Sequence, residues 1–244
     1  MKKILLTLIV AAMLSAAPAF AGFLNGGFED GNFDNWTKNG GTYNWGGSYT
    51  YLGDPGKSAI VTQGKDSYSG NKLDMVYGGT YSARVNNYDW DYHFSTISQT
   101  VTNWQDNSIY FAWASVIEDP GHSYAGHFSL VLRDITDGVD LYSKKFDYYS
   151  ADGEVVGGWK SGISGWGYCD WQIVNLDTTA VVGHDLSLTL LASDCGAGGH
   201  GGYAYLDGFG AKPPVQGGDV PEPATMALFG LGLIGLAGVS RKRK

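Results

Sequence analysis

The sequence predicts an all-β domain with the architecture of a sandwich. Short runs of alternating apolar and polar residues recur through the middle of the chain, and glycine-rich turns separate them. Residues 22–215 contain no amphipathic helical pattern of about ten residues or more. Their number suits one all-β domain, or at most two small ones. Many short strands joined by turns favour a β-sandwich or a barrel.

The first 21 residues have the pattern of a secretory signal peptide. A basic start, Met1-Lys2-Lys3, precedes an apolar run over residues 4–14 and a small-x-small cleavage site at Ala19-Phe20-Ala21. An uncleaved anchor is the alternative, but the apolar run is short for a membrane span. We therefore predict export, cleavage after Ala21 and a folded domain over residues 22–215.

Eight segments of this domain have the residue pattern of strands. In one of them, Ile109, Phe111 and Trp113 share a face. Asp137-Gly138 is a hairpin turn signal between two others. Residues 38–75 are less periodic, so we expect long loops and a few edge strands there. The predicted strands are residues 81–85, 95–101, 108–116, 128–133, 139–146, 171–176, 186–190 and 203–207.

The two cysteines, Cys169 and Cys195, predict a disulfide because they form an even pair in an exported chain. Closing the loop between them would stabilise the domain by about 3 kcal/mol in the chain-entropy model. A metal held by two cysteines and a catalytic free thiol are less favoured alternatives. Cys195 and His200 are also spaced as a nucleophile and a base could be, but we interpret the run Asp194–Tyr203 as a disulfide-pinned glycine loop in which His200 makes hydrogen bonds.

Charge and composition exclude one class of function. The chain has a net charge of −8, and six of its 16 basic residues lie in the two terminal segments, so the middle is still more acidic. A nucleic-acid-binding protein needs a basic surface. An acidic domain is instead compatible with cation binding and with solubility outside the cell. The 8 Trp and 16 Tyr favour strands and supply rings for stacking surfaces.

Three features follow one another at the C-terminus. Pro221-Glu222-Pro223 precedes an apolar span over residues 224–239, and Arg241-Lys242-Arg243-Lys244 ends the chain. The span approaches the length of a transmembrane helix, and the basic residues would resist translocation. A buried core helix is the less favoured alternative. We therefore predict a single transmembrane helix over residues 224–239.

This order resembles the PEP-CTERM sorting signal of Gram-negative bacteria that make exopolysaccharide. In that family an exosortase, a membrane-embedded cysteine peptidase, reads the signal and cuts near the motif. The resemblance implies that residues 216–244 are a sorting signal, that an exosortase is a partner, and that the chain is anchored to the membrane only transiently. The mature chain would then lie in the cell envelope or the extracellular matrix.

Several patterns in the domain resemble, in order, the galactose-binding-like domains that include many carbohydrate-binding modules. The matching segments are Asn25-Gly-Gly-Phe-Glu29 with Asn35-Trp36-Thr37 after it, Gly79 to Val85, Ile97 to Val101, and Ala204-Tyr-Leu-Asp207. The resemblance spans most of residues 23–211. It implies a jelly-roll sandwich of about eight strands.

That family often holds a structural Ca²⁺ between its first and last strands, and Glu29 and Asp207 occupy the matching positions. Calcium binds carboxylates together with backbone carbonyls, which a glycine-rich chain exposes. The resemblance therefore implies a calcium site with these two side-chain ligands. The alternative is that Glu29 is a surface residue and Asp207 belongs to a turn.

Aromatic side chains are the candidate sugar ligands, because their faces stack on the apolar faces of sugar rings. The segment Asn86–Tyr92 mixes Asn, Asp and aromatic residues without a strand pattern and is the best candidate loop. For each aromatic residue, packing in the core or on an edge strand is the alternative. The ligand-binding candidates are Trp45, Tyr88, Trp90 and Tyr92, with Tyr49, Tyr51, Trp159 and Trp166 behind them.

Catalytic motifs are not apparent in the sequence. His122 and His127 lie five residues apart without the glutamate of an H-E-x-x-H helix, and there is no G-x-S-x-G elbow. We therefore predict a non-enzymatic exported protein that acts in adhesion or exopolysaccharide interaction. The alternatives are a jelly-roll glycan hydrolase or lyase, and a structural coat protein without a small ligand.

Overall fold

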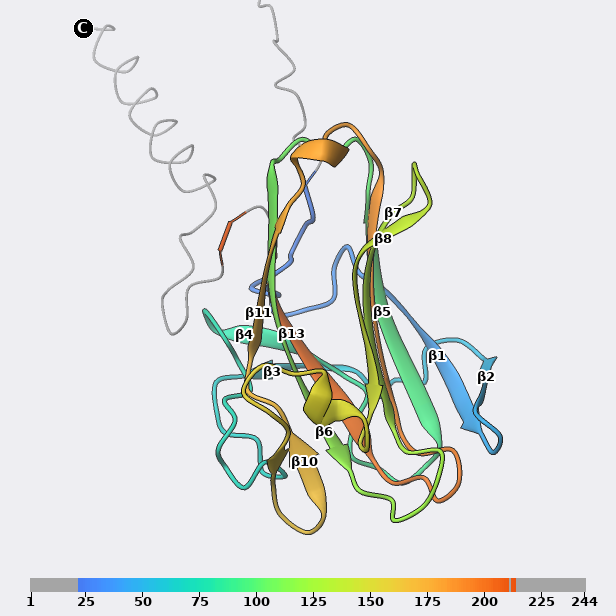
Figure 1. The fold of residues 1–244 in the computed structure, drawn as a ribbon. Helices are drawn as coiled ribbons and strands as arrows, with labels where there is room; N and C mark the ends of the chain where they lie inside the picture. Colours follow the sequence, from blue (N-terminus) through green and yellow to red (C-terminus); the bar gives the residue numbers. More distant parts are fainter. Residues whose placement is uncertain (1–21, 211, 214–244) are drawn as a thin grey trace, which may run out of the picture.

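The described chain is a sandwich of two antiparallel β-sheets that face each other (Figure 1). A computed structural model describes residues 22–210, 212 and 213. The predicted all-β sandwich is therefore confirmed. The predicted signal peptide, the sorting segment and the helix over 224–239 lie outside the described residues. Within the described residues, no helix is both long enough and apolar enough to cross a membrane.

The first sheet has six strands in the order β2-β1-β5-β12-β7-β8. Its centre is β12, which pairs antiparallel with β5 on one side and β7 on the other. The strands are β1 (Thr37–Asn44), β2 (Ser48–Tyr51), β5 (His93–Val101), β7 (His127–Asp134), β8 (Val139–Asp147) and β12 (Leu186–Ser193).

The second sheet has seven strands, in the order β3-β4-β13-β6-β10-β9, with β11 also paired to β6. The long strand β6 is its centre. The strands are β3 (Ala59–Thr62), β4 (Tyr81–Val85), β6 (Ser108–Glu118), β9 (Lys160–Ser161), β10 (Trp166–Tyr168), β11 (Gln172–Asp177) and β13 (Gly202–Gly210). Two short 3₁₀ turns, η1 (Ala151–Gly153) and η2 (Thr179–Val181), lie in the connections.

Successive strands cross repeatedly between the two sheets. From β4 the chain passes to β5 in the opposite sheet, returns to β6, and crosses again to β7. The last two strands, β12 and β13, also lie in different sheets. These crossovers between antiparallel sheets are those of a jelly roll, and they gather the connecting loops at the two ends of the sandwich.

The core lies between the sheets, where the inward faces alternate as the sequence pattern predicts. Phe111 and Trp113 of β6 are buried opposite Leu130 of β7 and Leu188 of β12. The ring of Trp113 stacks on Phe128, with 4.5 Å between centroids. Full burial of side chains of this size contributes about 2–3 kcal/mol each, so this layer supplies most of the driving force for folding.

The predicted strands agree with the structure in position and differ mainly at their ends. The segment 81–85 is β4 without change, whereas β12 and β13 extend past their predicted ends to Ser193 and Gly210. In the less periodic stretch 38–75 the chain forms β1, β2 and β3. Gly40 and Gly41 interrupt the alternation of β1, which pairs with both β2 and β5.

The predicted disulfide between Cys169 and Cys195 is wrong. Both cysteines are free and fully buried. Cys169 follows β10 of the second sheet, and its sulfur accepts a hydrogen bond from the Ser115 amide at 3.3 Å. Cys195 follows β12 of the first sheet and has histidines as its neighbours. Two cysteines form a disulfide only when the fold brings their sulfurs together, and the cysteine count does not report this.

Candidate functional site

Four connections meet at one end of the sandwich, which we call the loop end. They are the β1–β2 turn (44–48), the β4–β5 loop (86–92), the β6–β7 loop (119–126) and the β12–β13 loop (194–201). Backbone hydrogen bonds link them: Tyr43 donates to Tyr92 O at 2.7 Å, and Gly196 donates to Tyr124 O at 2.9 Å. Residues distant in the sequence therefore form one surface.

The four predicted sugar ligands lie in two of these connections, and all are exposed. Their exposed fractions are 71% for Trp45, 63% for Trp90, 45% for Tyr88 and 43% for Tyr92. Trp45 and Tyr92 line a cleft of about 440 Å³ together with Gly196 of the β12–β13 loop. Tyr88 and Trp90 do not line this cleft but belong to the same loop as Tyr92. Large exposed aromatic groups that cluster beside a cleft are typical of a binding surface.

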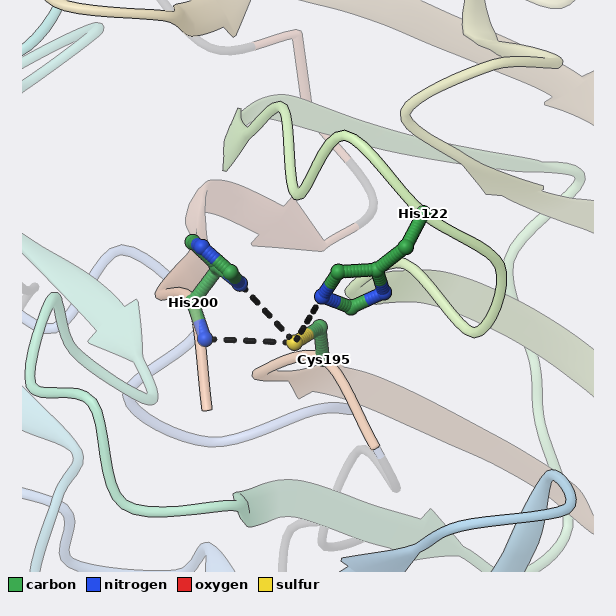
Figure 2. A group of neighbouring side chains, drawn as sticks. All are labelled: His122, Cys195 and His200. Atoms are coloured by element: carbon green, nitrogen blue, oxygen red, sulfur yellow. Dashed lines mark hydrogen bonds between the residues drawn. The ribbon is translucent and has the colours of Figure 1, made fainter. Parts of the chain in front are cut away.

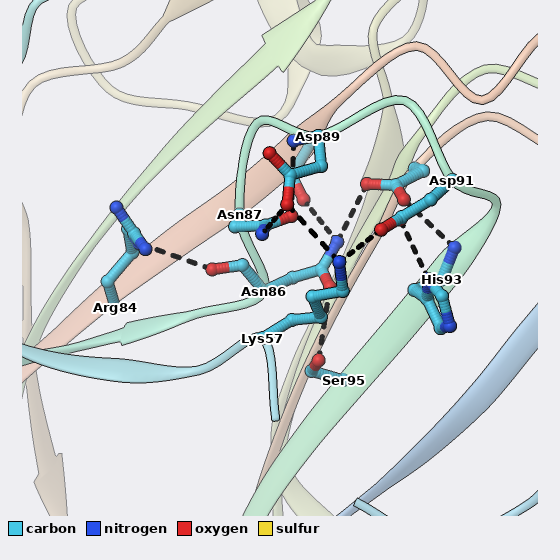
Figure 3. Close-up of polar contacts among 10 residues, drawn as sticks. Lys57, Arg84, Asn86, Asn87, Asp89, Asp91, His93 and Ser95 are labelled. Carbon is cyan, nitrogen blue, oxygen red and sulfur yellow. Dashed lines mark hydrogen bonds and ion pairs between the residues drawn. The ribbon is translucent and has the colours of Figure 1, made fainter. Parts of the chain in front are cut away.

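A buried polar network fixes the base of the 86–92 loop (Figure 3). The Asn86 amide donates to Asp194 Oδ1 at 2.8 Å and to Gly202 O at 2.9 Å, and its oxygen accepts from Ser95 Oγ at 3.0 Å. Asn86 is fully buried, so each of these bonds satisfies a group that would otherwise be desolvated without a partner. Its backbone is left-handed, with φ of 65°, a region that Asn tolerates better than most residues.

The same network contains two neighbouring carboxyl groups whose pKa values are shifted in opposite directions. Burial, and then the neighbouring Asp91, raise the pKa of Asp194 well above its usual value. Burial alone would also raise the pKa of Asp91, but hydrogen bonds from Asp194, Lys57 and His93 outweigh it and lower the pKa to about 2. Of the two, Asp194 therefore favours the protonated form and Asp91 the ionised form. Lys57 also pairs with Asp91, so its positive charge compensates the negative charge of the Asp91 carboxylate.

Trp90 is held by contacts with the β12–β13 loop. Its Nε1–H donates to Glu118 Oε2 at 2.8 Å, and the same oxygen accepts the Gly201 amide at 3.0 Å. A Cβ at Gly199 would lie 2.9 Å from the Trp90 carbonyl carbon, and Gly199 has a φ of 72°. Only glycine suits such a backbone and such an approach. The glycine-rich run after Cys195 thus lets two loops pack together.

A thiol and two imidazoles meet beside Trp90. Cys195 and His200 come from the β12–β13 loop and His122 from the β6–β7 loop, and their ligand atoms lie within 4.8 Å of one another. The prediction that His200 makes loop hydrogen bonds agrees with this arrangement, because its amide donates to Cys195 Sγ. The contact between His122 and Cys195 was not predicted from the sequence. His122 lies 73 residues from Cys195, and no local pattern marks such a pairing.

The predicted calcium ligands Glu29 and Asp207 lie close to each other and flank Gly27. Glu29 accepts the Thr80 and Tyr81 amides, and Asp207 Oδ2 accepts the Tyr77 and Gly78 amides. Burial, opposed by hydrogen bonds from Gly78, Tyr77 and Gly208, raises the pKa of Asp207 to about 7, and the Glu29 charge adds to the rise. Backbone amides thus satisfy these carboxylates, and the calcium site stays a prediction that rests on the residue types, since calcium binds carboxylate oxygens.

The other aromatic candidates pack against side chains of the domain. Tyr49 and Tyr51 pack edge-on against Phe94, each with 4.9 Å between ring centroids. Trp166 is buried in the second sheet, and Trp159 packs against Phe146. For Trp159 and Trp166 the packing alternative is therefore the better interpretation.

The termini of the chain bear on where this surface acts. Residues 219–244 match the PEP-CTERM protein-sorting motif. The chain carries a PEP-CTERM sorting signal. This agrees with the resemblance of the Pro221-Glu222-Pro223 segment and its basic end, and it implies export with a C-terminal tail directed to the membrane. No curated protein sequence matches the chain.

Solved structures similar to this chain have low sequence identity to it. The module TmCBM61, solved in complex with beta-1,4-galactotriose, is 16% identical with a TM-score of 0.42, over 77% of this chain and 95% of its own. A non-crystalline cellulose specific module, CBM28, is 12% identical with a TM-score of 0.37, over 76% and 91%. The K2 cleaved adhesin domain of Lys-gingipain is 13% identical with a TM-score of 0.33, over 72% and 87%.

Proposed function

We propose that this chain is an exosortase-processed protein of the cell envelope or extracellular matrix, and that it binds glycans at its loop end without cleaving them. The observation that carries the proposal is a cluster of large aromatic side chains that are exposed to solvent in two adjoining connections. These side chains are Trp45, Tyr88, Trp90 and Tyr92. Rings held in fixed positions bind sugar faces at little conformational cost.

The polar surroundings of these rings support a sugar ligand. Asn44 and Asp91 line the same cleft as Trp45 and Tyr92. The Asn44 amide is held by Ser48 and Thr50, and the Asp91 carboxylate by Lys57 and His93, so both polar groups are fixed in position. A mostly apolar cleft with a few polar groups is the usual form of a small-ligand site. The network below Asn86 keeps the loop in one conformation, so the rings are preorganised.

Affinity electrophoresis tests glycan binding. The purified full-length chain is run through gels that contain β-1,4-galactan, mannan, xylan, amorphous cellulose or a bacterial exopolysaccharide. We expect at least one polysaccharide to retard the chain, and we expect Trp45→Ala and Tyr92→Ala to migrate freely. Tyr110→Ala is the matched control, because Tyr110 lies on β6 outside the loop end. Equal mobility in every gel would contradict binding, and release of reducing sugar would contradict a non-enzymatic role.

The same proposal includes a calcium ion held by Glu29 and Asp207. Such an ion would neutralise the two carboxylates and tie the start of the domain to β13. Its role would be structural, because the pair is separate from the aromatic side chains of the loop end.

Processing by an exosortase completes the proposal. The enzyme would act near Pro221-Glu222-Pro223 and release the domain from its membrane tail. Mass spectrometry of the chain recovered from a producing cell tests this step. We expect the mature species to lack the basic run Arg241–Lys244, and a mature species that retains it would contradict processing.

A further inference from the structure

We propose that His122, Cys195 and His200 form a zinc-binding site. Figure 2 shows both imidazoles directed at the Cys195 sulfur from different loops. His200 Nδ1 lies 3.2 Å and His122 Nε2 3.9 Å from Sγ. The proposal does not depend on glycan binding, since it rests on different side chains.

The spacing of these atoms suits a tetrahedral ion. Zinc bonds to sulfur and imidazole nitrogen are about 2.3 Å and 2.0 Å long, so a tetrahedral angle separates the two donors by about 3.5 Å. The two observed separations, 3.2 Å and 3.9 Å, lie on either side of this value. Small side-chain rotations would bring all three donors to bonding distance of one ion.

The hydrogen bonds around the cluster prepare its donors for a metal. His122 Nδ1 lies 2.7 Å from Ser123 O, a carbonyl that can only accept, so Nδ1 carries the proton and Nε2 presents its lone pair to the sulfur. Imidazoles that bind metals are commonly oriented in this way by a backbone carbonyl. The Cys195 sulfur accepts the Gly198 and His200 amides at 3.1 Å and 3.2 Å, which hold the sulfur in place beside both imidazoles.

The donor set selects the metal. A thiolate with two imidazoles suits zinc and copper, whereas calcium and magnesium bind oxygen ligands. We assign zinc because three protein ligands with one position for water is a common zinc arrangement. Cys195 is buried while both histidines are partly exposed, so the remaining position lies on the solvent side.

The other two His/Asp groups among the described residues are less suitable. In the group Asp91, His93 and Asp194, Lys57 already pairs with Asp91 as a cation. In the group Asp134, Asp137 and His184, the His184 Nδ1 is bonded to Asp134 at 2.7 Å, and a thiolate is lacking. No ion pair within residues 22–210 involves the cluster at Cys195.

Metal binding by the purified full-length chain, stripped of metal and kept reduced, tests the proposal. We expect one zinc ion per chain, and cobalt in its place should give a thiolate-to-cobalt charge-transfer band. Cys195→Ser should lose the band, and both Cys195→Ser and His200→Gln should lower zinc affinity by about 100-fold or more. Cys169→Ser is the matched control and should keep both, because Cys169 lies on the other sheet.

A second measurement separates loss of the site from loss of the fold. The ion would join the 119–126 loop to the 194–201 loop, so zinc should raise the melting temperature of the wild type and of Cys169→Ser but not of folded Cys195→Ser. Absence of stoichiometric zinc from folded wild type, selective binding of copper over zinc, or zinc binding that persists in Cys195→Ser would each overturn the proposal.

Discussion

The indole of Trp90 lies against the imidazole of His200, with 5.0 Å between the ring centroids. This contact joins two features of the loop end: the aromatic side chains of the 86–92 loop and the thiol–imidazole cluster of the 194–201 loop. Glu118 strengthens the connection, because it accepts hydrogen bonds from both Trp90 and Gly201. The two loops are therefore expected to respond together to substitution.

The buried side chain of Asn86 should be essential for the stability of the loop end. Asn86→Ala removes the partner of Asp194, Gly202 and Ser95 and leaves buried polar groups unsatisfied. We expect the free energy of unfolding to fall by about 2–4 kcal/mol. Urea denaturation measures it. Asn175→Ala, on the exposed face of β11, should change it by less than about 0.5 kcal/mol; equal effects of the two substitutions would contradict the network.

Asp207 should make stability depend on pH when calcium is absent. Between about pH 4 and pH 7 the folded chain keeps a proton on Asp207 that the unfolded chain has released. The free energy of unfolding therefore falls as pH rises through this window, by at most about 4 kcal/mol. Urea denaturation in EDTA at several pH values measures the slope. Asp207→Asn should lack this component, and parallel curves for the two chains would show that Asp207 does not titrate as described.

Calcium should reverse that loss, because it binds the ionised carboxylates. At a concentration of about 100 times the dissociation constant it would add about 2.7 kcal/mol, which corresponds to a rise of about 5–10 °C in melting temperature. Glu29→Gln and Asp207→Asn should abolish the rise, and Asp30→Asn, an exposed neighbour, should keep it. A melting temperature of the wild type that is the same in calcium and in EDTA would contradict the calcium site.

Both cysteines should be free thiols, because they lie apart in buried positions of the fold. Burial raises the pKa of Cys169 to about 12, so its thiol should not be alkylated in the folded chain. In denaturant without reductant, both cysteines should take up iodoacetamide, which mass spectrometry detects. A peptide pair linked through Cys169 and Cys195 would contradict the structure and restore the disulfide.

The strands could be predicted from the sequence because their pattern is local. The alternation around Ile109 and Phe111 reports the face that packs in the core, and hydrophobic burial enforces it. The aromatic cluster could also be predicted in part from the sequence, since Asn86–Tyr92 has a composition that is not typical of a buried strand. The thiol–imidazole cluster could not be predicted from the sequence. His122 meets Cys195 only because β6–β7 and β12–β13 turn at the same end of the sandwich, and that meeting depends on topology.

Isothermal titration calorimetry tests the central claim most directly. A polysaccharide that retards the wild-type chain in a gel is titrated into wild type, Trp45→Ala, Tyr92→Ala and Tyr110→Ala. We expect Trp45→Ala and Tyr92→Ala each to weaken binding by about tenfold or more, a loss of about 1.4 kcal/mol or more, and Tyr110→Ala to bind as wild type does. Unchanged affinity in the first two variants, with all four chains folded, would contradict glycan binding at the loop end.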